Sequence, residues 1–512
     1  MMIPHTSDPV ARPGAGFPVS GLLSVLANEA PRLVGDGNVR LSGVRQDSRR
    51  VEPGDLFVAR SGGKVSGAEF AQAAVERGAV ALIVERGAPL PVLSVPMIEV
   101  ADARRSLALA AEAVYGNPSR QLALVGITGT NGKTTTSWLV ECALSGIGKK
   151  PARLGTVGFA FNGQSVDSPL TTPEADDISR YAARARDAGG THFVMEVSSV
   201  ALTLERVRAL HFKVAAFSNL TQDHLDFHGT LAEYGEAKAQ LFTELAPEVS
   251  VINVDDPFGA KLAQRAQGRV LRVSKRSGAD LFPKRITVDG QGIRGVIQTP
   301  AGDVALESRL VGEHNLENLL LALGILQALD VDLVSAARAL GQAPQVPGRL
   351  ERCDEPGDDV LVLVDYAHTP DALERVLIAT RSLTQKRVLC VFGCGGDRDP
   401  QKRARMGGAV GRLADYAFLT NDNPRSEEPS AIAAAVEFGL REMDAKYVVE
   451  LDRARAIERA VSEAGPGDVV LIAGKGHEPY QLIGDQSFPF DDRVEARRAL
   501  AVRRQRGGTW QA

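Results

Sequence analysis

The sequence has 512 residues, of which 44% are hydrophobic and 24% are charged, and its formal net charge is −4. This composition is ordinary for a folded globular protein and supplies no overall charge that would draw it to nucleic acid. No apolar run approaches the roughly 20 residues needed to span a bilayer, so we expect no membrane insertion and a cytoplasmic location. The four cysteines have neither metal-site nor disulfide spacing, which indicates reduced thiols; they are Cys142, Cys353, Cys390 and Cys394.

Residues 1–19 are rich in proline and glycine and lack the apolar segment of a signal peptide, so we expect a flexible tail there. After the tail, short apolar runs alternate with helical patterns, which predicts an α/β protein with mostly parallel sheets. At roughly 100–200 residues per domain, the length suggests three domains. Turn signals place them at residues 20–117, 118–346 and 347–512.

The predicted strands of the first two domains are short and rich in valine and isoleucine. They are residues 55–59 and 80–84 in the first domain, and residues 122–128, 193–197, 214–218 and 249–254 in the second.

In the third domain, four predicted strands each run directly into a polar or glycine-rich segment. The strands are residues 360–364, 387–392, 416–420 and 469–473, and the segments are residues 365–368, 393–398, 422–425 and 474–478. Ligands bind outside the carboxyl ends of the strands in open parallel sheets, so these segments are expected to share one edge. The sequence therefore predicts a binding site at that edge.

A glycine-rich loop at residues 129–135, with the sequence GTNGKTT, lies between the strand at 122–128 and a helical pattern. Backbone N–H groups of such a loop can surround phosphate oxygens, while Lys133 can reach the outer phosphates and Thr134 can offer its hydroxyl to Mg²⁺. The strict phosphate-loop pattern requires glycine where this chain has Ile127. The loop is therefore a variant, and the alternative is a purely structural turn.

This loop resembles the ATP loop of the Mur ligase family, and the resemblance continues along nearly the whole chain after the tail. The matching segments, in order, are residues 47–49, 54–57, 171–173, 196–199, 219–228, 236–238, 314–318, 347–351 and 365–368. Each segment alone is weak evidence, whereas the ordered set is specific. Residues 422–425, with the sequence DNPR, resemble the signature of the members that use meso-2,6-diaminopimelate.

The resemblance implies a central P-loop-type ATPase domain of mostly parallel sheet and a Rossmann-like C-terminal domain. It also implies an ATP-dependent ligase that adds meso-2,6-diaminopimelate to UDP-N-acetylmuramoyl-L-alanyl-D-glutamate in peptidoglycan biosynthesis. The expected intermediate is an acyl phosphate, and the expected cofactor is Mg²⁺, with ATP as a co-substrate. The expected partners are these small molecules alone, and the expected state is a monomer.

For catalysis, the family match selects Lys133, Lys238 and His224. Thr134, Glu196, His224 and Lys238 match the metal site, where the family lysine is a carbamate. A lysine reacts with CO₂ only as the neutral amine, so burial or a cationic neighbour must lower the pKa of Lys238. A surface lysine, an exposed strand-end acid and a structural histidine are the alternatives for Lys238, Glu196 and His224.

Two binding sites follow from the same match. The residues expected to bind ATP are Gly129, Thr130, Asn131, Gly132, Lys133, Thr134, Thr135, Asn318, Arg349 and Asp365. The residues expected to bind the UDP substrate are Gln46, Ser48, Gly63, Lys64, Val65, Thr171, Thr172, Ser198 and Arg206. The chain departs from the family at Val200, where many members have histidine, and at Leu204, where some have glutamine. One amide contact to the substrate is therefore in doubt.

The residues expected to bind the amino acid are Arg398, Asp422, Asn423, Pro424, Arg425, Gly474 and Glu478. Arginine can bind the distal carboxylate of diaminopimelate, and carboxylates can accept hydrogen bonds from its ammonium. Lysine lacks the distal carboxylate and would leave an arginine unpaired, which disfavours it. Lys475 and His477 lie in the same glycine-flanked loop, and they are left out of the expected set because a structural role is their alternative. The alternative for residues 422–425 is a simple proline turn.

The sequence leaves rival functions to weigh. A lysine-adding or folylpolyglutamate-type ligase conflicts with the DNPR segment and with the UDP-type first domain. A P-loop NTPase without ligase activity leaves Lys238 and Arg425 unexplained, and a non-catalytic nucleotide-binding module leaves Lys133 and Glu196 idle. We therefore favour the diaminopimelate-adding ligase.

Overall fold

The computed structural model describes residues 16–61, 66–223, 225–397 and 399–507. The chain divides into two compact units. The first unit contains the residues up to Lys284 together with Val296–Ala305 and Glu317–Leu340. The second unit contains Arg285–Gly295, Leu306–Leu316 and the residues from Gly341 onward.

The first unit begins with a five-stranded sheet in the order β2-β7-β6-β5-β4, parallel except at the β2–β7 pair. The strands are β2 (Arg32–Val34), β4 (Gly43–Arg45), β5 (Asp55–Ala59), β6 (Ala81–Glu85) and β7 (Met97–Val100). Helices α1 (Leu22–Val25), α2 (Ala71–Glu76) and α3 (Ala103–Val114) accompany it, and β1 (Phe17–Pro18) pairs with β3 (Arg40–Leu41). Strands β5 and β6 are almost wholly buried, as expected for strands covered on both faces.

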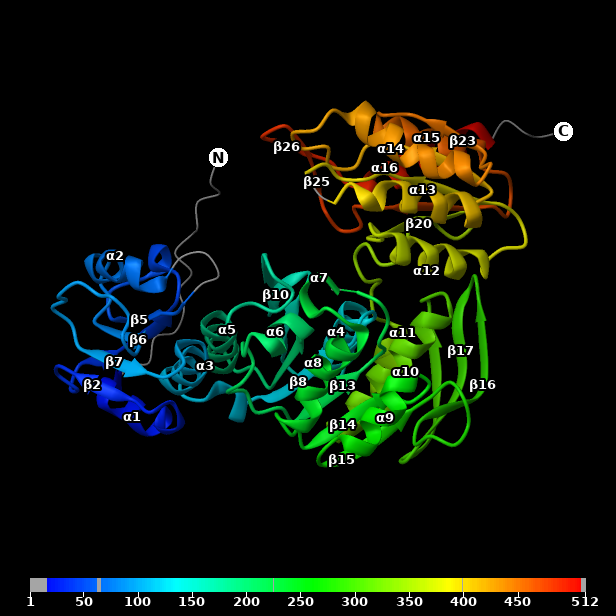
Figure 1. Ribbon diagram of the computed structural model, residues 1–512. Coiled ribbons are helices and arrows are strands. Elements are labelled where there is room, and N and C mark those ends of the chain that lie inside the picture. Colours follow the sequence, from blue (N-terminus) through cyan, green and yellow to red (C-terminus); the bar gives the residue numbers. More distant parts are fainter. Residues whose placement is uncertain (1–15, 62–65, 224, 398, 508–512) are drawn as a thin grey trace. The chain divides into compact units, whose positions relative to one another are not determined.

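The second sheet of this unit has eight strands in the order β11-β10-β9-β12-β8-β13-β14-β15. Figure 1 labels β10, β8, β13, β14 and β15 of this sheet. The strands are β8 (Ala123–Thr128), β9 (Pro151–Gly155), β10 (Gly158–Phe161), β11 (Gln164–Val166), β12 (His192–Glu196), β13 (Val214–Phe217), β14 (Val249–Asn253) and β15 (Arg269–Val273). All neighbours from β9 to β15 are parallel, while β10 runs antiparallel to β9 and β11. The central strand β8 therefore ends beside the ends of β12 and β13.

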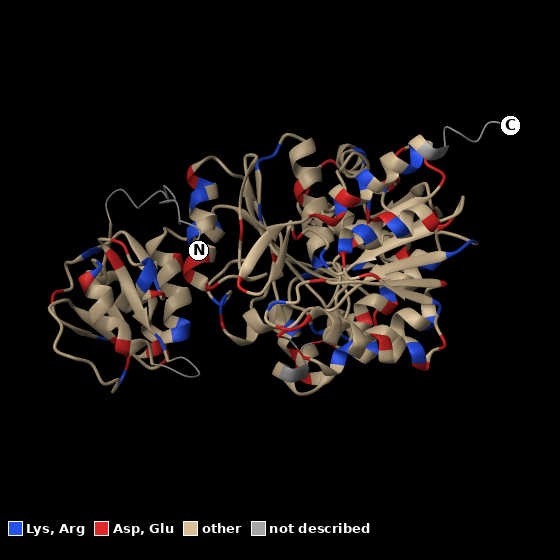
Figure 2. Ribbon diagram, turned by 90° about the horizontal axis from the view of Figure 1, so that it is seen from above, with Lys and Arg blue, Asp and Glu red and all other residues tan. Residues whose placement is uncertain are grey.

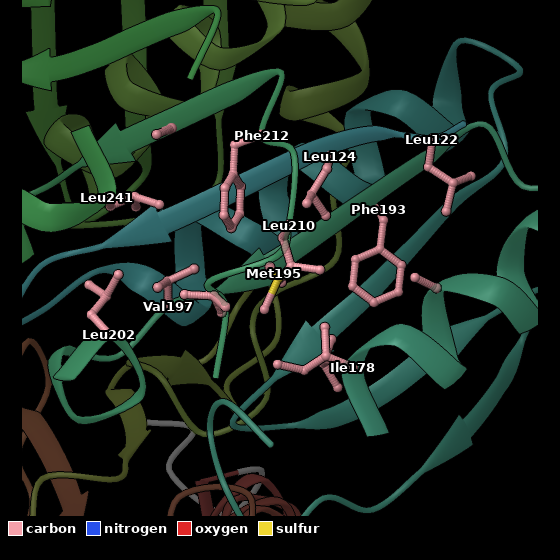
Figure 3. Packing of buried hydrophobic residues seen from close by; sticks show 14 of the residues in the cluster. Leu122, Leu124, Ile178, Phe193, Met195, Val197, Leu202, Leu210, Phe212 and Leu241 are labelled. Atoms are coloured by element: carbon pink, nitrogen blue, oxygen red, sulfur yellow. The ribbon is translucent and has the colours of Figure 1, made fainter. Parts of the chain in front are cut away.

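The helices beside this sheet are α4 (Lys133–Gly146), α5 (Ala175–Asp187), α6 (Ser199–Thr203), α7 (Leu225–His228), α8 (Leu231–Thr243), α9 (Pro257–Arg265), α10 (Glu313–Ala328) and α11 (Leu333–Gly341). One large apolar core lies between the sheet and helices α5, α6 and α8. Figure 3 shows Phe193 and Met195 of β12 in this core with Ile178 of α5 and Leu202 of α6. This packing fixes β12, whose last residue is Glu196.

A three-stranded sheet and a two-stranded antiparallel hairpin complete the fold besides the large sheets. Strands β16 (Phe282–Asp289), β17 (Gly292–Thr299) and β18 (Gly302–Ser308) form a three-stranded sheet. In the second unit, β25 (Tyr480–Ile483) and β26 (Gln486–Pro489) form a hairpin.

The main sheet of the second unit has the order β19-β20-β24-β21-β22-β23. Its strands are β19 (Glu351–Arg352), β20 (Leu361–Asp365), β21 (Val388–Phe392), β22 (Tyr416–Leu419), β23 (Tyr447–Val449) and β24 (Val469–Ala473). All but β19 are parallel to their neighbours. The carboxyl ends of β20, β24, β21 and β22 therefore follow one another along one edge, as the sequence predicted.

Helices cover both faces of this sheet. One core contains residues of α12 (Pro370–Arg381), α13 (Gln401–Leu413) and α14 (Pro429–Glu442), and the other contains residues of α15 (Arg453–Glu463) and α16 (Asp492–Gly507). This is a doubly wound arrangement, and the predicted α/β class with mostly parallel sheets is confirmed. Within the described part of the chain, no helix has the length and apolar character needed to cross a membrane.

Residues of both charge signs are interspersed along the helices, as the ribbon colours of Figure 2 show. Ion pairs such as Arg265–Glu236 and Arg504–Asp358 follow from this mixing. The arrangement agrees with the small net charge of the sequence.

Candidate active site

The glycine-rich loop connects β8 to α4 and requires glycine at two positions. Gly129 and Gly132 have φ angles of 142° and 86°, which side chains rarely adopt. A Cβ at Gly129 would lie 2.0 Å from Ser218 Oγ, and one at Gly132 would lie 2.3 Å from Asn318 Oδ1. The loop is therefore closely surrounded, and Asn318, predicted at the nucleotide, lies against it.

The segment after β13 holds the loop in place. Thr130 N donates to Asn219 O at 2.8 Å, and Asn131 N donates to Asn219 Oδ1 at 3.0 Å. Ser218 Oγ donates to Asn131 O at 2.5 Å. These bonds fix the loop, so little ordering is needed when phosphate oxygens bind.

Lys133 lies over this loop. Its Nζ donates to Gly129 O at 2.8 Å and to Thr130 O at 2.9 Å. The Lys133 ammonium therefore lies beside the loop's backbone N–H groups and the amino end of α4, both of which favour a bound anion.

Glu196 is fully buried at the end of β12. Its Oε2 accepts hydrogen bonds from Thr134 Oγ1 at 3.0 Å and Thr156 Oγ1 at 3.2 Å, and its Oε1 accepts one from Thr156 N at 2.9 Å. Gly155 leaves space for this carboxylate, because a Cβ there would lie 2.1 Å from Glu196 Oε1. The structure therefore brings Thr134 and Glu196 together, and their role as metal ligands stays a prediction.

Lys238, on α8, is buried and reaches the same loop. Its Nζ donates to Gly129 O at 3.0 Å and lies 4.2 Å from the centre of the Tyr234 ring. Burial, and after it the charge of Lys133, lowers the pKa of Lys238 well below its usual value, although Asp223 opposes the shift. The alternative of an ordinary surface lysine is wrong.

The residues predicted for the UDP substrate fall into two groups. Thr171, Thr172, Ser198 and Arg206 adjoin Glu196: Thr172 Oγ1 donates to Glu196 O at 2.9 Å and accepts from Ser198 N at 3.0 Å. Arg206 donates to Thr172 O at 3.0 Å and pairs with Glu174 at 2.7 Å. Thr171 Oγ1 lies 3.2 Å from Thr156 Oγ1.

The second group follows β4. Gln46 N donates to Asp176 Oδ2 at 3.4 Å, and Ser48 begins a short 3₁₀ helix. Five predicted site residues lie outside the described residues: Gly63, Lys64, Val65, His224 and Arg398. The nearby His228, within the described part, lies 2.9 Å from Ser199 Oγ through its Nε2.

In the second unit, Asp365 is the last residue of β20, and its side chain binds backbone N–H groups of two segments. Its carboxylate accepts hydrogen bonds from Leu350 N and Ala367 N, both at 2.8 Å. Burial raises the pKa of Asp365, and the charge of Arg349 opposes this. The Arg349 guanidinium stacks 5.0 Å from the centre of the Tyr366 ring, which places both predicted nucleotide residues of this unit together.

A fully buried lysine, Lys475, lies at the centre of the predicted amino-acid site. Its Nζ donates to Asn423 Oδ1 at 3.0 Å and lies 3.7 Å from Asp422 Oδ1 and 3.9 Å from Glu478 Oε2. Asn423 in turn donates to Glu478 Oε2 at 3.1 Å. Burial lowers the pKa of Lys475 and raises the pKa of Glu478. Sequence reasoning left Lys475 aside, although its flanking glycines at a strand end were a usable signal.

Arg425 has a φ of 53°, in the left-handed region, and its Nη1 donates to Gly396 O at 2.8 Å. The hairpin β25–β26, which sequence reasoning missed, holds it: Arg425 N donates to Leu482 O at 3.1 Å, and Gly484 N donates to Arg425 O at 2.7 Å. The Gly484-Asp485 pair, a favoured two-residue hairpin turn, was the signal for this hairpin. Two further predicted residues lie nearby: Pro424 is beside Gly396, and Gly474 is beside Asp422.

These features define a nucleotide-binding α/β protein. The first unit has a strand, a glycine-rich loop and a helix with Lys133 and Thr134, and the second unit has a doubly wound sheet whose strands end in polar segments. Three family models match consecutive parts of the chain. They are the Mur ligase family catalytic domain at residues 40–115, the Mur ligase middle domain at residues 127–326 and the Mur ligase glutamate ligase domain at residues 348–476. The chain belongs to the Mur ligase family.

Full-length relatives agree with this assignment. The chain is 46% identical over 472 residues to a UDP-N-acetylmuramoyl-L-alanyl-D-glutamate--2,6-diaminopimelate ligase of Gloeobacter violaceus, covering 92% of this chain and 96% of the relative. It is 44% identical to the ligase of the same name from Geobacillus thermodenitrificans, covering 91% and 96%. A solved structure of a protein of that name has a TM-score of 0.70 and 32% identity, covering 96% of this chain and 99% of the other.

Proposed function

We propose that this chain is an ATP-dependent ligase that joins meso-2,6-diaminopimelate to UDP-N-acetylmuramoyl-L-alanyl-D-glutamate in peptidoglycan biosynthesis. The observation that carries the proposal is the second-unit cluster of Asp422, Asn423, Arg425, Lys475 and Glu478, which offers fixed charges of both signs to an amino acid with two zwitterionic ends. The names of the relatives at 44–46% identity over more than nine-tenths of the chain support it.

The chemistry has two balanced steps. The γ-carboxylate of the substrate's D-glutamate attacks the γ-phosphorus of ATP, so that an acyl phosphate forms and ADP leaves. The amine of diaminopimelate then attacks the acyl carbon, the phosphate leaves with the bonding electrons, and the amine loses a proton. Phosphorylation is needed because a carboxylate is a poor electrophile.

The residues around the glycine-rich loop of the first unit suit the first step, in which two anions approach each other. Lys133 supplies a positive charge over the loop, and the backbone N–H groups at the start of α4 supply fixed donors. Thr171, Thr172, Ser198 and Arg206 adjoin Glu196 and present hydroxyls and a cation for the UDP-sugar peptide. Asn318, Arg349 and Asp365 are assigned to the nucleotide.

The donor set around Glu196 fits Mg²⁺. Thr134 Oγ1, at the start of α4, lies 3.0 Å from the carboxylate of Glu196, at the end of β12, and both are oxygen donors of the kind that Mg²⁺ prefers. Mg²⁺ bound there supplies charge neutralisation for the phosphates. Thr134 and Glu196 would hold the ion, and we assign His224 and Lys238 to complete its site.

We assign Lys238 as a carbamate, because its Nζ is buried against Gly129 O and beside Lys133. A lowered lysine pKa supplies the neutral amine that CO₂ requires. The amine nitrogen forms a bond to the carbon of CO₂ and releases a proton, giving an anionic oxygen ligand.

In the second unit, Arg425 is assigned to the distal carboxylate of diaminopimelate, together with Arg398. Asp422 and Glu478 are assigned to its ammonium. The positive charge of Lys475 compensates these two carboxylates when no amine is bound. Lysine offers no carboxylate to Arg425 and is expected to be a poor substrate.

The support for three working domains is that the first unit contains two separate sheets with separate cores, and the second unit contains a third. We assign residues 20–117 to the UDP group, residues 118–346 to ATP and residues 347–512 to the amino acid. We also propose that the monomer is the active species.

The deciding experiment is phosphate release from ATP and Mg²⁺ with UDP-N-acetylmuramoyl-L-alanyl-D-glutamate, in parallel reactions with meso-diaminopimelate, L-lysine or no amine. We expect release, and a product mass that includes the amino acid, only with diaminopimelate. Turnover with lysine instead contradicts the assigned specificity, and release without any amine contradicts the ligase. Arg425→Ala is expected to reduce kcat/KM for diaminopimelate, while Arg441→Ala, a surface arginine on the outer end of α14, serves as the matched control.

A further inference from the structure

A fully buried ion pair lies behind the amino-acid cluster of the second unit. Arg453, the first residue of α15, donates through Nε to Asp492 Oδ1 and through Nη2 to Asp492 Oδ2, both at 2.7 Å. Asp492 is the first residue of α16, and neither side chain is exposed. Charged residues are almost never buried completely unless paired, and a buried pair adds little stability over apolar packing, so it needs another explanation.

Two further N–H groups of Arg453 bind backbone carbonyls. Nη1 donates to Asn421 O at 3.1 Å, and Nη2 donates to Ala473 O at 3.0 Å. These two carbonyls immediately precede Asp422 and Gly474 in the chain. One guanidinium therefore joins the segment after β22 to the segment after β24, and anchors both to the starts of α15 and α16.

The two joined segments also touch each other directly in front of Arg453. Gly474 has a φ of 124°, and a Cβ there would lie 2.7 Å from Asp422 Oδ2 and 3.7 Å from Arg453 Nη2. The Asp422 carboxylate thus packs on the backbone of Gly474. Lys475 is the next residue in the chain, and its Nζ lies 3.7 Å from Asp422 Oδ1. A shift of either segment would move Asp422 relative to Lys475 and Glu478.

We propose that Arg453 and Asp492 are positioning residues, which hold Asp422 and Gly474 in register and thereby set the affinity of the site for diaminopimelate. This inference rests on the proposed function for the identity of the amino acid. The planar guanidinium can bind a carboxylate bidentately and two carbonyls at once, whereas an ammonium cannot reproduce that geometry. Misplacing a binding group by about 1 Å can reduce the rate on the order of a hundredfold.

The test compares two variants of the pair with a matched control. Arg453→Lys keeps the charge and loses the planar guanidinium. The double variant R453M/D492L replaces the pair by apolar side chains of similar size and leaves no charge buried alone. The control is Arg387→Met, because Arg387 pairs with Asp468 at 2.6 Å at the opposite ends of β21 and β24. Steady-state kinetics and thermal midpoints are measured for all of them.

We expect KM for diaminopimelate to rise about tenfold or more in both Arg453 variants, with KM for ATP and for the UDP substrate within about twofold of wild type. Arg387→Met should leave all three KM values unchanged, whatever its thermal midpoint. An unchanged KM for diaminopimelate, or a parallel change in all three KM values, overturns the positioning role.

Amide hydrogen exchange separates a failure of this inference from a failure of the proposed function, since it needs no turnover. In R453M/D492L, or in Asp492→Asn if that variant does not fold, exchange should quicken in residues 421–426 and 474–478 and stay unchanged in β21 and β24. If wild type does not ligate diaminopimelate, the function fails, and faster exchange confined to these segments still supports positioning. Unchanged exchange there overturns it.

Discussion

Thr134 Oγ1 and Glu196 Oε2 are 3.0 Å apart, which joins the first turn of α4 to the carboxyl end of β12. The two residues are 62 positions apart in the chain. They meet because β8 and β12 are parallel neighbours, with Glu196 opposite Ile127. A hydroxyl and a carboxylate thus converge beside the phosphate loop, where Glu196 is fully buried.

Glu196→Gln tests this carboxylate, because the amide keeps the shape and removes the charge. We expect kcat to fall on the order of a hundredfold to a thousandfold, the usual loss when one preorganised electrostatic group is removed. Phosphate release at several Mg²⁺ concentrations measures it. Glu141→Gln is the control, since Glu141 lies on α4 and pairs with Arg153 at 2.6 Å. Equal activities of the two variants would refute a role for Glu196.

Gly132 and Gly148 flank the same helix, α4, and both have positive φ, at 86° and 79°. A Cβ at Gly132 would lie 2.3 Å from Asn318 Oδ1, whereas nothing lies within 4 Å of one at Gly148. Gly132→Ala should therefore weaken nucleotide binding at least tenfold, while Gly148→Ala should cost about 1 kcal/mol of stability and keep nucleotide affinity. Titration with a fluorescent ATP analogue and thermal melting distinguish the two effects. Similar affinities in both variants would show that crowding at Gly132 is unimportant.

The strand ends of the second unit were predictable because their signals are local. Buried strands are continuous apolar runs, and the residues at which β20, β21, β22 and β24 end are followed at once by polar or glycine-rich segments. The parallel order then places these segments along one edge. The phosphate loop was predictable for the same reason, since strand, glycines, lysine and helix are consecutive in the chain.

The burial of Lys475, Arg453 and Asp492 was not predictable in this way. Lysine and arginine at loop and helix starts are usually exposed, and only the packing of α15 and α16 on the sheet removes Arg453 from solvent. The hairpin β25–β26 was missed although it has a local turn signal, because its strands are mostly exposed and lack an apolar face. Partners far apart in sequence, such as Arg453 and Asn421, leave no pattern in either segment.

Lys238→Arg tests the assigned carbamate. Arginine can still donate a hydrogen bond to Gly129 O but cannot react with CO₂ in this way, so we expect kcat to fall at least a hundredfold. Wild type in ¹³C-bicarbonate should show a carbamate resonance in ¹³C NMR that is absent from the variant. Lys213→Arg, on a lysine outside the predicted site, should keep both activity and the resonance. A variant without the resonance but with full activity would remove the carbamate from the mechanism.

Asp176 and Asp177, both in the first turn of α5, are expected to make opposite contributions to the pH dependence of stability. Burial, and then the charge of Asp177, raises the pKa of Asp176 from 3.8 to about 7. Burial also acts to raise the pKa of Asp177, but the bonds from Arg50 at 2.7 and 2.8 Å and the charge of Arg180 outweigh it, and the pKa is lowered.

A carboxyl with a raised folded-state pKa stabilises the fold most below its unfolded value, and this stability is lost as the pH rises from about 4 to about 7. Asp176→Asn should therefore gain stability relative to wild type across that window, with the largest gain at neutral pH. Asp177 contributes stability above its unfolded value, which is lost as the pH falls through its lower folded value. Asp177→Asn should therefore melt below wild type at pH 7, and this difference should shrink below about pH 4. Thermal midpoints of the three proteins from pH 3 to pH 8 test both signs, and curves that stay parallel to wild type would show that neither carboxyl is perturbed in the fold.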